Sequence, residues 1–207
     1  MADKKSKKKI NFNFLIINGP NLNMLGMREK VYGEYKIKDV INFTNESLRR
    51  LELELELELE LELEKEKEKG LEKDLNCLYK FKIDWFQSNS EGKIIDKLHW
   101  VAKHKKYGAL IINPGAYSHT SVAMLDALSI LQIPIVEVHI TNVFKRESFR
   151  RRLLTARAAS MVMCGFGFEV YYLAIYSCIR KYLLYKNIGK NLKGSLKCIK
   201  QQILERD

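Results

Sequence analysis

Three short polar segments of the sequence contain residue types suited to acid–base chemistry. They are Asn18-Gly-Pro-Asn-Leu-Asn-Met-Leu-Gly26, Asn113-Pro-Gly-Ala-Tyr-Ser-His-Thr-Ser121 and Glu137-Val-His-Ile-Thr-Asn142. Each begins where an apolar run ends. Residues just beyond the strand ends of an open parallel sheet line a shared crevice, so polar groups far apart in sequence can meet there around one ligand. We therefore predict one active site built from all three segments.

The elements that must position these groups follow from short apolar runs that alternate with amphipathic segments. We expect strands over 12–18, 79–86, 108–113, 134–140 and 159–166, and helices over 91–106, 118–131 and 168–186. Regular alternation of strand and helix indicates a parallel sheet covered by helices on both faces. The prediction is an α/β fold, flavodoxin-like and doubly wound, with a five-stranded parallel sheet in a single domain over 11–186.

An unusual segment occupies the place of the first crossover helix. Residues 51–64 are seven Leu-Glu repeats, and a Lys-Glu run continues to Lys69. A period of two is typical of strands, whereas Leu and Glu are both good helix formers. A helix would place leucines all round and lack a clean apolar face. We interpret 51–69 as an expansion that forms a projecting helix or a mobile loop and leaves the site intact. A partner-binding arm is the alternative, and exposed leucines would promote self-association.

The net charge of +11 is concentrated at the two ends of the chain. Residues 1–10 carry +4 and residues 180–207 carry +6, so the other 169 residues carry only +1. We interpret 1–10 as a basic N-terminal tail and 187–207 as a basic C-terminal extension, both solvated. No specific nucleic-acid partner is predicted. Nucleic-acid binding through the tails stays as an alternative, and it would depend steeply on salt.

Cysteine spacing and hydropathy exclude several other classes of protein. The four cysteines form no C-x-x-C pair, which argues against a zinc site or a disulfide framework. No apolar run approaches 18 residues, and the lysine-rich start lacks the apolar core of a signal peptide. We expect a cytoplasmic protein without a membrane span or a bound metal.

In this order, the three segments resemble type II 3-dehydroquinate dehydratase. Arg28 and Tyr32 follow the first segment, Asp126 follows the second, and R-E-S-F-R over 146–150 follows the third. The resemblance covers about 12–180 apart from the expansion. It implies a shikimate-pathway lyase of aromatic amino acid biosynthesis that dehydrates 3-dehydroquinate to 3-dehydroshikimate without a cofactor. It also implies a trimer-based homo-oligomer, a dodecamer.

The resemblance assigns the catalytic roles. Tyr32 is the base that removes the proton alpha to the ketone, and Arg28, four residues upstream, favours the ionised phenol because a nearby guanidinium stabilises its charge. His139 is the general acid, and Glu137 lies two residues earlier on the same face of the strand, where it favours the protonated imidazole. Asn21 holds an ordered water that supports the enolate.

Six further residues are implied to bind the substrate. Asn113, the backbone N–H groups of Ile140 and Thr141 and the Thr141 hydroxyl bind the carboxylate, since backbone amides suit an anion. The ring hydroxyls contact the remaining three: His119, Arg150, and Asp126 of a neighbouring subunit.

The sequence departs from the family pattern in two places near these residues. The loop R-E-K-V-Y-G over 28–33 is one residue shorter than usual and lacks a proline, and Thr141 replaces the commoner serine. The alternative to the lyase is therefore a catalytically impaired small-molecule-binding module of the same fold.

Overall fold

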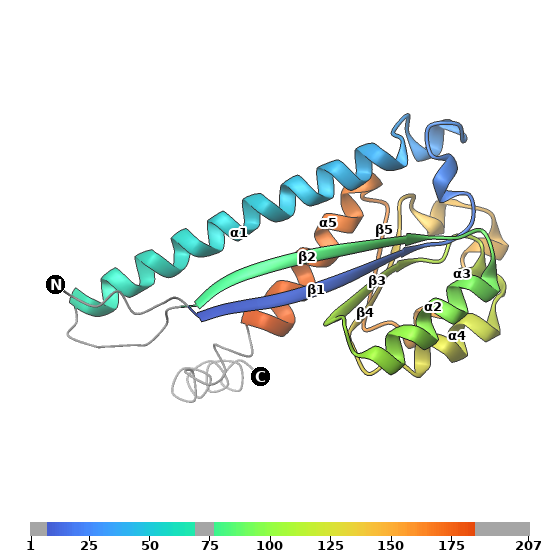
Figure 1. Cartoon of the computed structure of the whole chain (residues 1–207). Helices are drawn as coiled ribbons and strands as arrows, with labels where there is room; N and C mark the ends of the chain where they lie inside the picture. The colour runs from blue at the N-terminus through green and yellow to red at the C-terminus, as the bar shows by residue number, and fades with distance from the viewer. Residues whose placement is uncertain (1–7, 69–76, 185–207) are drawn as a thin grey trace, which may run out of the picture.

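The computed structural model describes residues 8–68 and 77–184, so most of both predicted tails lies outside the described residues. Five parallel strands form one sheet in the order β2-β1-β3-β4-β5 (Figure 1). They are β1 Lys8–Asn18, β2 Cys77–Gln87, β3 Ala109–Asn113, β4 Ile135–His139 and β5 Met161–Cys164. This strand order is that of flavodoxin-like folds, and it confirms the predicted fold class.

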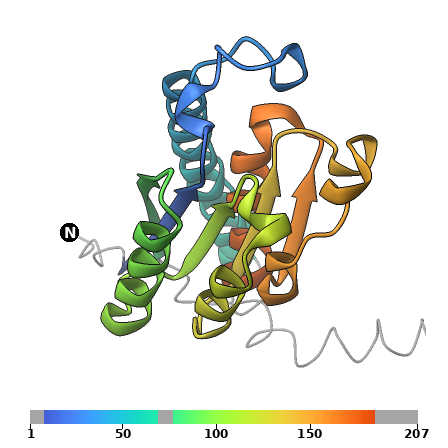
Figure 2. The ribbon, with the colours of Figure 1, turned by 90° about the vertical axis from the view of Figure 1, so that its right-hand side faces the viewer.

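Helices cover both faces of the sheet (Figure 2). They are α1 Ile37–Glu68, α2 Glu91–His104, α3 Tyr117–Thr120, α4 Val122–Ser129 and α5 Val170–Cys178. In β1, Phe14 and Ile16 pack in one core cluster with α1 and α5, whereas Leu15 and Ile17 pack in the other with α2 and α4. Strand β1 is therefore apolar on both faces, as a doubly wound sheet requires.

Two predicted helices differ from those in the structure. The segment 118–131 is divided at Ser121, whose hydroxyl accepts a 2.8 Å hydrogen bond from the N–H of Met124 and so caps α4. The segment 168–186 is α-helical only from Val170 to Cys178 and continues as the π-helical turn Ile179–Leu184. In the described ranges, no helix combines the length and the apolar character needed to cross a membrane.

The Leu-Glu expansion is part of α1, and its leucines form two stripes on opposite sides of the helix. A step of two residues turns an α-helix by about 200°, and a step of four by about 40° beyond a full turn. Leu51 and Leu55, the inner stripe, are buried at 3% and 5% exposure. Leu53, Leu57 and Leu61, the outer stripe, are 61%, 60% and 56% exposed. The expectation that this helix would have no core face is thus wrong for the inner stripe.

The inner stripe packs on an extension of the sheet rather than projecting from the fold. The first half of β1, from Lys8 to Asn13, pairs with β2 alone, because β3 joins β1 only from Phe14 onward. Phe12 and Phe81 of this two-stranded ribbon pack in the same cluster as the inner stripe. The expansion therefore lies at the N-terminal end of β1, away from the loop that follows this strand (Figure 1).

Glu52, between the two stripes, protects the outer edge of β2. One carboxylate oxygen accepts a 2.5 Å hydrogen bond from the N–H of Phe81, and the other lies 3.4 Å from Nζ of Lys80. Edge strands with free backbone groups are sites of unwanted strand pairing. This contact satisfies one such group.

Candidate active site

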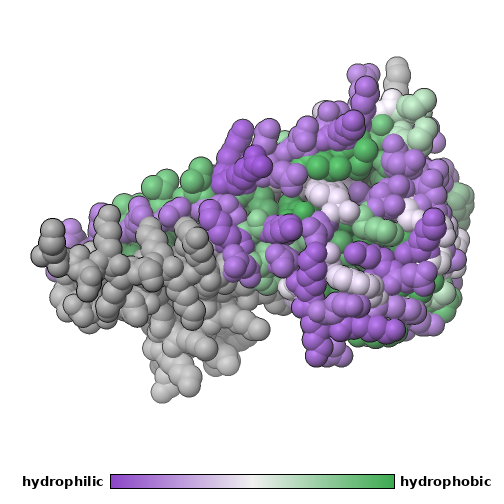
Figure 3. All heavy atoms as spheres, in the orientation of Figure 1, coloured by the Kyte–Doolittle hydropathy of each residue, from purple (hydrophilic) through white to green (hydrophobic). Residues whose placement is uncertain are grey.

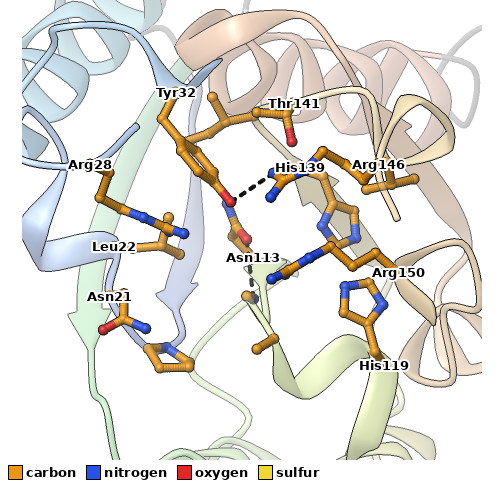
Figure 4. Close-up of a pocket in the computed structure, with 15 residues that line it drawn as sticks. Asn21, Leu22, Arg28, Tyr32, Asn113, His119, His139, Thr141, Arg146 and Arg150 are labelled. Atoms are coloured by element: carbon orange, nitrogen blue, oxygen red, sulfur yellow. Dashed lines mark hydrogen bonds between the residues drawn. The ribbon is translucent and has the colours of Figure 1, made fainter. Parts of the chain in front are cut away.

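The loops that follow β1, β3 and β4 surround a pocket at the C-terminal edge of the sheet (Figure 4). The order of the strands reverses here, because β2 follows β1 on one side whereas β3, β4 and β5 follow on the other. Open α/β sheets bind ligands at such a reversal. Its lining residues are Pro20, Asn21, Leu22, Arg28, Tyr32, Asn113, Gly115, Ala116, His119, His139, Ile140, Thr141, Val143, Arg146 and Arg150. The three polar segments of the sequence thus meet around one pocket, as predicted.

A glycine allows the first two loops to touch. The N–H of Gly19 donates a 2.7 Å hydrogen bond to the carbonyl of Asn113. A Cβ atom at Gly19 would lie 2.3 Å from the carbonyl oxygen of Pro114. Only glycine permits this approach, which brings the start of the first polar segment against the second.

Tyr32 lies between two guanidinium groups. Its hydroxyl accepts a 2.9 Å hydrogen bond from Nη1 of Arg146, and the guanidinium carbon of Arg28 lies 3.8 Å from the centre of its ring. The hydrogen bond to Tyr32 raises the pKa of Arg146 above its already high usual value. Arg28 therefore contacts the ring face, while the cation bonded to the oxygen is Arg146, which the sequence analysis did not assign to Tyr32.

One carboxylate holds two of the pocket's arginines. Oε2 of Glu147 lies 3.4 Å from Nε of Arg146 and 3.0 Å from Nε of Arg150. The two arginines are four residues apart: Arg146 directly follows one short 3-10 turn and Arg150 ends the next, so both reach the pocket from the same loop. Their positions around Tyr32 and His119 are visible in Figure 4.

His139 and Glu137 form a buried pair at the end of β4. Nε2 of His139 lies 2.9 Å from Oε1 of Glu137, and Glu137 is fully buried. A carboxylate only accepts hydrogen bonds, so Nε2 carries the proton in this contact. The other carboxylate oxygen accepts a 2.6 Å hydrogen bond from the hydroxyl of Thr155, which is also fully buried. Both oxygens of the buried Glu137 therefore have partners.

His119 lies beside His139, with the ring centres 6.5 Å apart. Its Nδ1–H donates a 3.1 Å hydrogen bond to the carbonyl of Arg152, which fixes the proton on that nitrogen in the neutral ring. Burial lowers the pKa of His119. The neutral imidazole that results has an acceptor at Nε2.

Asn113 belongs to a buried hydrogen-bond chain beneath the pocket. Its Nδ2 donates to the hydroxyl of Tyr171 at 3.0 Å, and this hydroxyl donates to Oδ1 of Asn18 at 2.7 Å. Oδ1 of Asn113 accepts a 3.2 Å hydrogen bond from the N–H of Gly115. An amide nitrogen carries two protons, so one N–H of Asn113 is left for a ligand. Burial raises the pKa of Tyr171, which keeps this phenol protonated.

The remaining predicted residues divide between the pocket and the surface. Asn21, Ile140 and Thr141 line the pocket, and Asn21 has a left-handed backbone conformation with φ of 65°. Asp126 is exposed on α4 and is not a lining residue. Its expected role in a neighbouring subunit remains a prediction.

Three polar residues of this region were not predicted from the sequence. Arg146 was within the quoted R-E-S-F-R segment, but nothing in the spacing singled it out from the other arginines of 146–152. Thr155 and Tyr171 are remote in sequence from the groups they bind, Glu137 and Asn113, and no motif contains them. Only the packing of the chain brings them there.

The charge of the pocket indicates the kind of ligand it suits. Its lining contains three arginines and no carboxylate among the described residues. Guanidinium groups bind carboxylates and other oxyanions through charge-assisted hydrogen bonds. The pocket therefore suits a small anion with hydroxyl groups, placed between a phenol and an imidazole.

Comparison with known proteins places this chain among enzymes of one type. A family model described as "Dehydroquinase class II" matches residues 12–68 and 63–179, and the two matches overlap over 63–68, within the expansion. The 3-dehydroquinate dehydratase of Clostridium botulinum strain Hall is 44% identical over 169 residues, covering 79% of this chain and 91% of the relative. That of Caldicellulosiruptor bescii is 42% identical over 164 residues, covering 79% and 93%.

Solved structures give the same result. The type II dehydroquinase of Butyrivibrio crossotus superposes with a TM-score of 0.62 at 34% identity, covering 81% of this chain and 97% of that one. The enzyme of Propionibacterium acnes superposes with a TM-score of 0.61 at 29% identity, covering 82% and 97%. Sequence, fold and pocket agree, and the chain belongs to the class II dehydroquinase family.

Proposed function

We propose that this protein dehydrates 3-dehydroquinate to 3-dehydroshikimate, the shikimate-pathway step of its relatives. The observation that carries this proposal is the placement of Tyr32, bonded to Arg146, and of His139, bonded to Glu137, in one cationic pocket. The reaction needs a base for the proton alpha to the ketone, support for the enolate and an acid for the departing hydroxyl. The pocket offers a group for each.

Tyr32 acts as the base in its ionised form. It takes the proton from the carbon alpha to the ketone, and the electrons of the broken C–H bond move to the carbonyl oxygen as an enolate. Arg146 at the oxygen and Arg28 over the ring stabilise the phenolate by charge. A water held by Asn21 supports the enolate oxygen.

His139 completes the reaction as the acid. The enolate re-forms its carbonyl, the new carbon–carbon double bond forms, and the tertiary C–O bond breaks as the hydroxyl takes a proton from the imidazolium and leaves as water. Glu137 balances the positive charge of the ring and fixes its orientation, and Thr155 in turn fixes Glu137. The proton on Tyr32 then returns to solvent.

The substrate carboxylate binds to Asn113, to the backbone N–H groups of Ile140 and Thr141 and to the Thr141 hydroxyl. The free N–H of Asn113 and the strand-end position of the other two residues support this assignment. His119 and Arg150 bind the ring hydroxyls, since a neutral imidazole and a guanidinium offer an acceptor and donors.

The assembly and location of the enzyme belong to the same proposal. The protein works in the cytoplasm as a trimer-based dodecamer, in which Asp126 of one subunit reaches the pocket of its neighbour. The exposure of Asp126 on α4 is compatible with this role. Light scattering of the purified full chain measures the number of subunits, and a stable monomer would contradict the assembly.

The direct test measures the ultraviolet absorbance of the enone product when purified protein meets 3-dehydroquinate. We expect turnover by the full chain and a loss of about 10²- to 10⁴-fold in Tyr32→Phe and His139→Ala, the usual contribution of a positioned acid or base. Tyr35→Phe is the matched control, because Tyr35 lies three residues away in the same loop and is not a lining residue. An unchanged rate in Tyr32→Phe would refute the assignment of the base.

Two further results distinguish the alternatives. No lysine lines the described pocket, so borohydride added with substrate is expected to leave the activity intact, whereas trapping on a lysine would indicate Schiff-base chemistry. Binding of 3-dehydroquinate without product formation would instead favour the catalytically impaired binding module.

A further inference from the structure

The outer stripe of α1 is an apolar surface that the function does not explain. Leu53, Leu57 and Leu61 are spaced by four residues and are each more than half exposed. Figure 3 shows hydrophobic side chains along this helix among hydrophilic ones. A regular row of exposed leucines is typical of a surface that binds another helix through i, i+4 and i+8 contacts.

The negative charge of the expansion indicates which kind of helix can bind to the outer stripe. Residues 51–64 contain seven glutamates and no lysine or arginine. A second copy of α1 would therefore place glutamates against glutamates, and like charges across an interface cost several kcal/mol. The stripe instead suits a helix that has both an apolar face and many lysines.

The C-terminal segment of this same chain has that pattern. Between 186 and 204 there are five lysines and no acidic residue. From 192 to 204 the apolar residues recur at helical spacing, which predicts one apolar face; they are Leu192, Leu196, Ile199 and Ile203. The lysines fall between them, at positions suited to the glutamates beside the outer stripe.

The described part of the chain ends on the same face of the sheet as α1. Cys178 and Ile179 lie in the same core cluster as the inner stripe, and the last described turn ends at Leu184, five residues after Ile179. Residues 185–191, if extended, would span about 23 Å. An α-helix with side chains is about 10–12 Å across, so this length suffices to pass around α1 to its outer side.

We propose that residues 192–204 bind as an amphipathic helix to the outer stripe of α1 in the same chain. The apolar face covers Leu53, Leu57 and Leu61, and the lysines lie beside the acidic repeat. The expansion and the basic extension are then two halves of one interaction, independent of the reaction in the pocket.

Disulfide crosslinking of the full chain tests the proposal. The variant Leu57→Cys with Ile199→Cys, in a Cys198→Ser background, is expected to form a bond within one chain under mild oxidation. Ile130→Cys with Ile199→Cys is the matched control, because Ile130 is 52% exposed and lies just after α4, on the other side of the sheet. Equal crosslinking of both pairs, or crosslinks only between chains, would overturn the proposal.

Limited trypsin digestion provides a second test that needs no cysteine. Cleavage after Lys193 and Lys197 is expected to become about tenfold faster or more in the triple variant Leu53→Ser, Leu57→Ser and Leu61→Ser, since proteolysis follows the population of the released segment. The solvent-exposed positions of these leucines allow the variant to fold. Cleavage at an unchanged rate, together with protection by anionic phospholipid vesicles, would assign the segment to a membrane surface instead.

Discussion

The hydroxyl of Tyr32 accepts a hydrogen bond from Arg146, a residue 114 positions further along the chain. This contact joins the loop after β1 to the loop after β4 across the mouth of the pocket (Figure 4). The loop over 28–33 lacks the proline and one residue of the usual family pattern, yet it brings Tyr32 to the pocket. The position of the proposed base is thus defined by an arginine from the opposite wall as well as by its own loop.

Arg146→Gln is expected to lower kcat by about 10²-fold or more, because it removes the donor at the oxygen of the proposed phenolate. The melting temperature should change little, since the arginine lies at an open pocket. Arg152→Gln is the matched control, because Arg152 is exposed in the same loop and contributes only its backbone carbonyl to His119. Equal rates in the two variants would exclude a role for Arg146 in catalysis.

Thr155→Val is expected to reduce both stability and activity. The substitution leaves one oxygen of the buried Glu137 without its donor, at a cost of about 1–3 kcal/mol in the free energy of unfolding. Activity falls with it because the carboxylate that orients His139 is no longer fixed. Thr155→Ser retains the hydroxyl and should recover both quantities, as measured by urea denaturation and product absorbance. A valine variant as active as the serine variant would argue against this role.

Cys178 makes the stability depend on pH in the alkaline range. Burial raises the pKa of its thiol from 9.0 to about 12. The folded protein keeps the thiol neutral, so its stabilising contribution is complete below pH 9 and is lost as the pH rises toward 12. The stability difference between wild type and Cys178→Ala should therefore narrow by about 1.4 kcal/mol per pH unit above pH 9. Ile175→Val, a buried neighbour that does not titrate, should show a constant difference.

The two leucine stripes of α1 predict opposite responses to the same substitution. Leu55→Ala is expected to lower the free energy of unfolding by about 2–5 kcal/mol, because Leu55 packs in the core. Leu57→Ala, two residues away and 60% exposed, is expected to change the stability of a chain truncated after Leu184 by less than about 0.5 kcal/mol. Similar losses of stability at both positions would show that Leu57 is buried as deeply as Leu55.

Local patterns predicted most of the fold. The segment 91–106 was predicted from its helical spacing, and it corresponds closely to α2, which begins at Glu91 after the capping Ser90. The first strand was predicted to begin at residue 12, whereas β1 begins at Lys8. Asn11 and Asn13 interrupt its apolar run, and only pairing with β2 keeps the strand extended there. Such pairing depends on tertiary contacts, which no single segment contains.

The candidate site was predictable to the extent that it lies at strand ends. Glu137 and His139 share a face because strand residues two apart always do, and the structure confirms their contact. Arg146, Thr155 and Tyr171 reach the site from turns and a helix, where the direction of a side chain depends on the packing of the whole domain. Their residue types alone did not indicate that they belong to the site.

The ribbon formed by the first halves of β1 and β2 has a consequence for how this architecture evolves. Leu51 and Leu55 of the repeat pack in the same core cluster as Phe12 and Phe81 of this ribbon, so the first turns of the repeat have strand beneath them. This part of the repeat lies at the rim of the domain opposite the reactive groups (Figure 1). A lineage can thus acquire repetitive codons there and fold them into ordered structure while selection on catalysis goes on undisturbed.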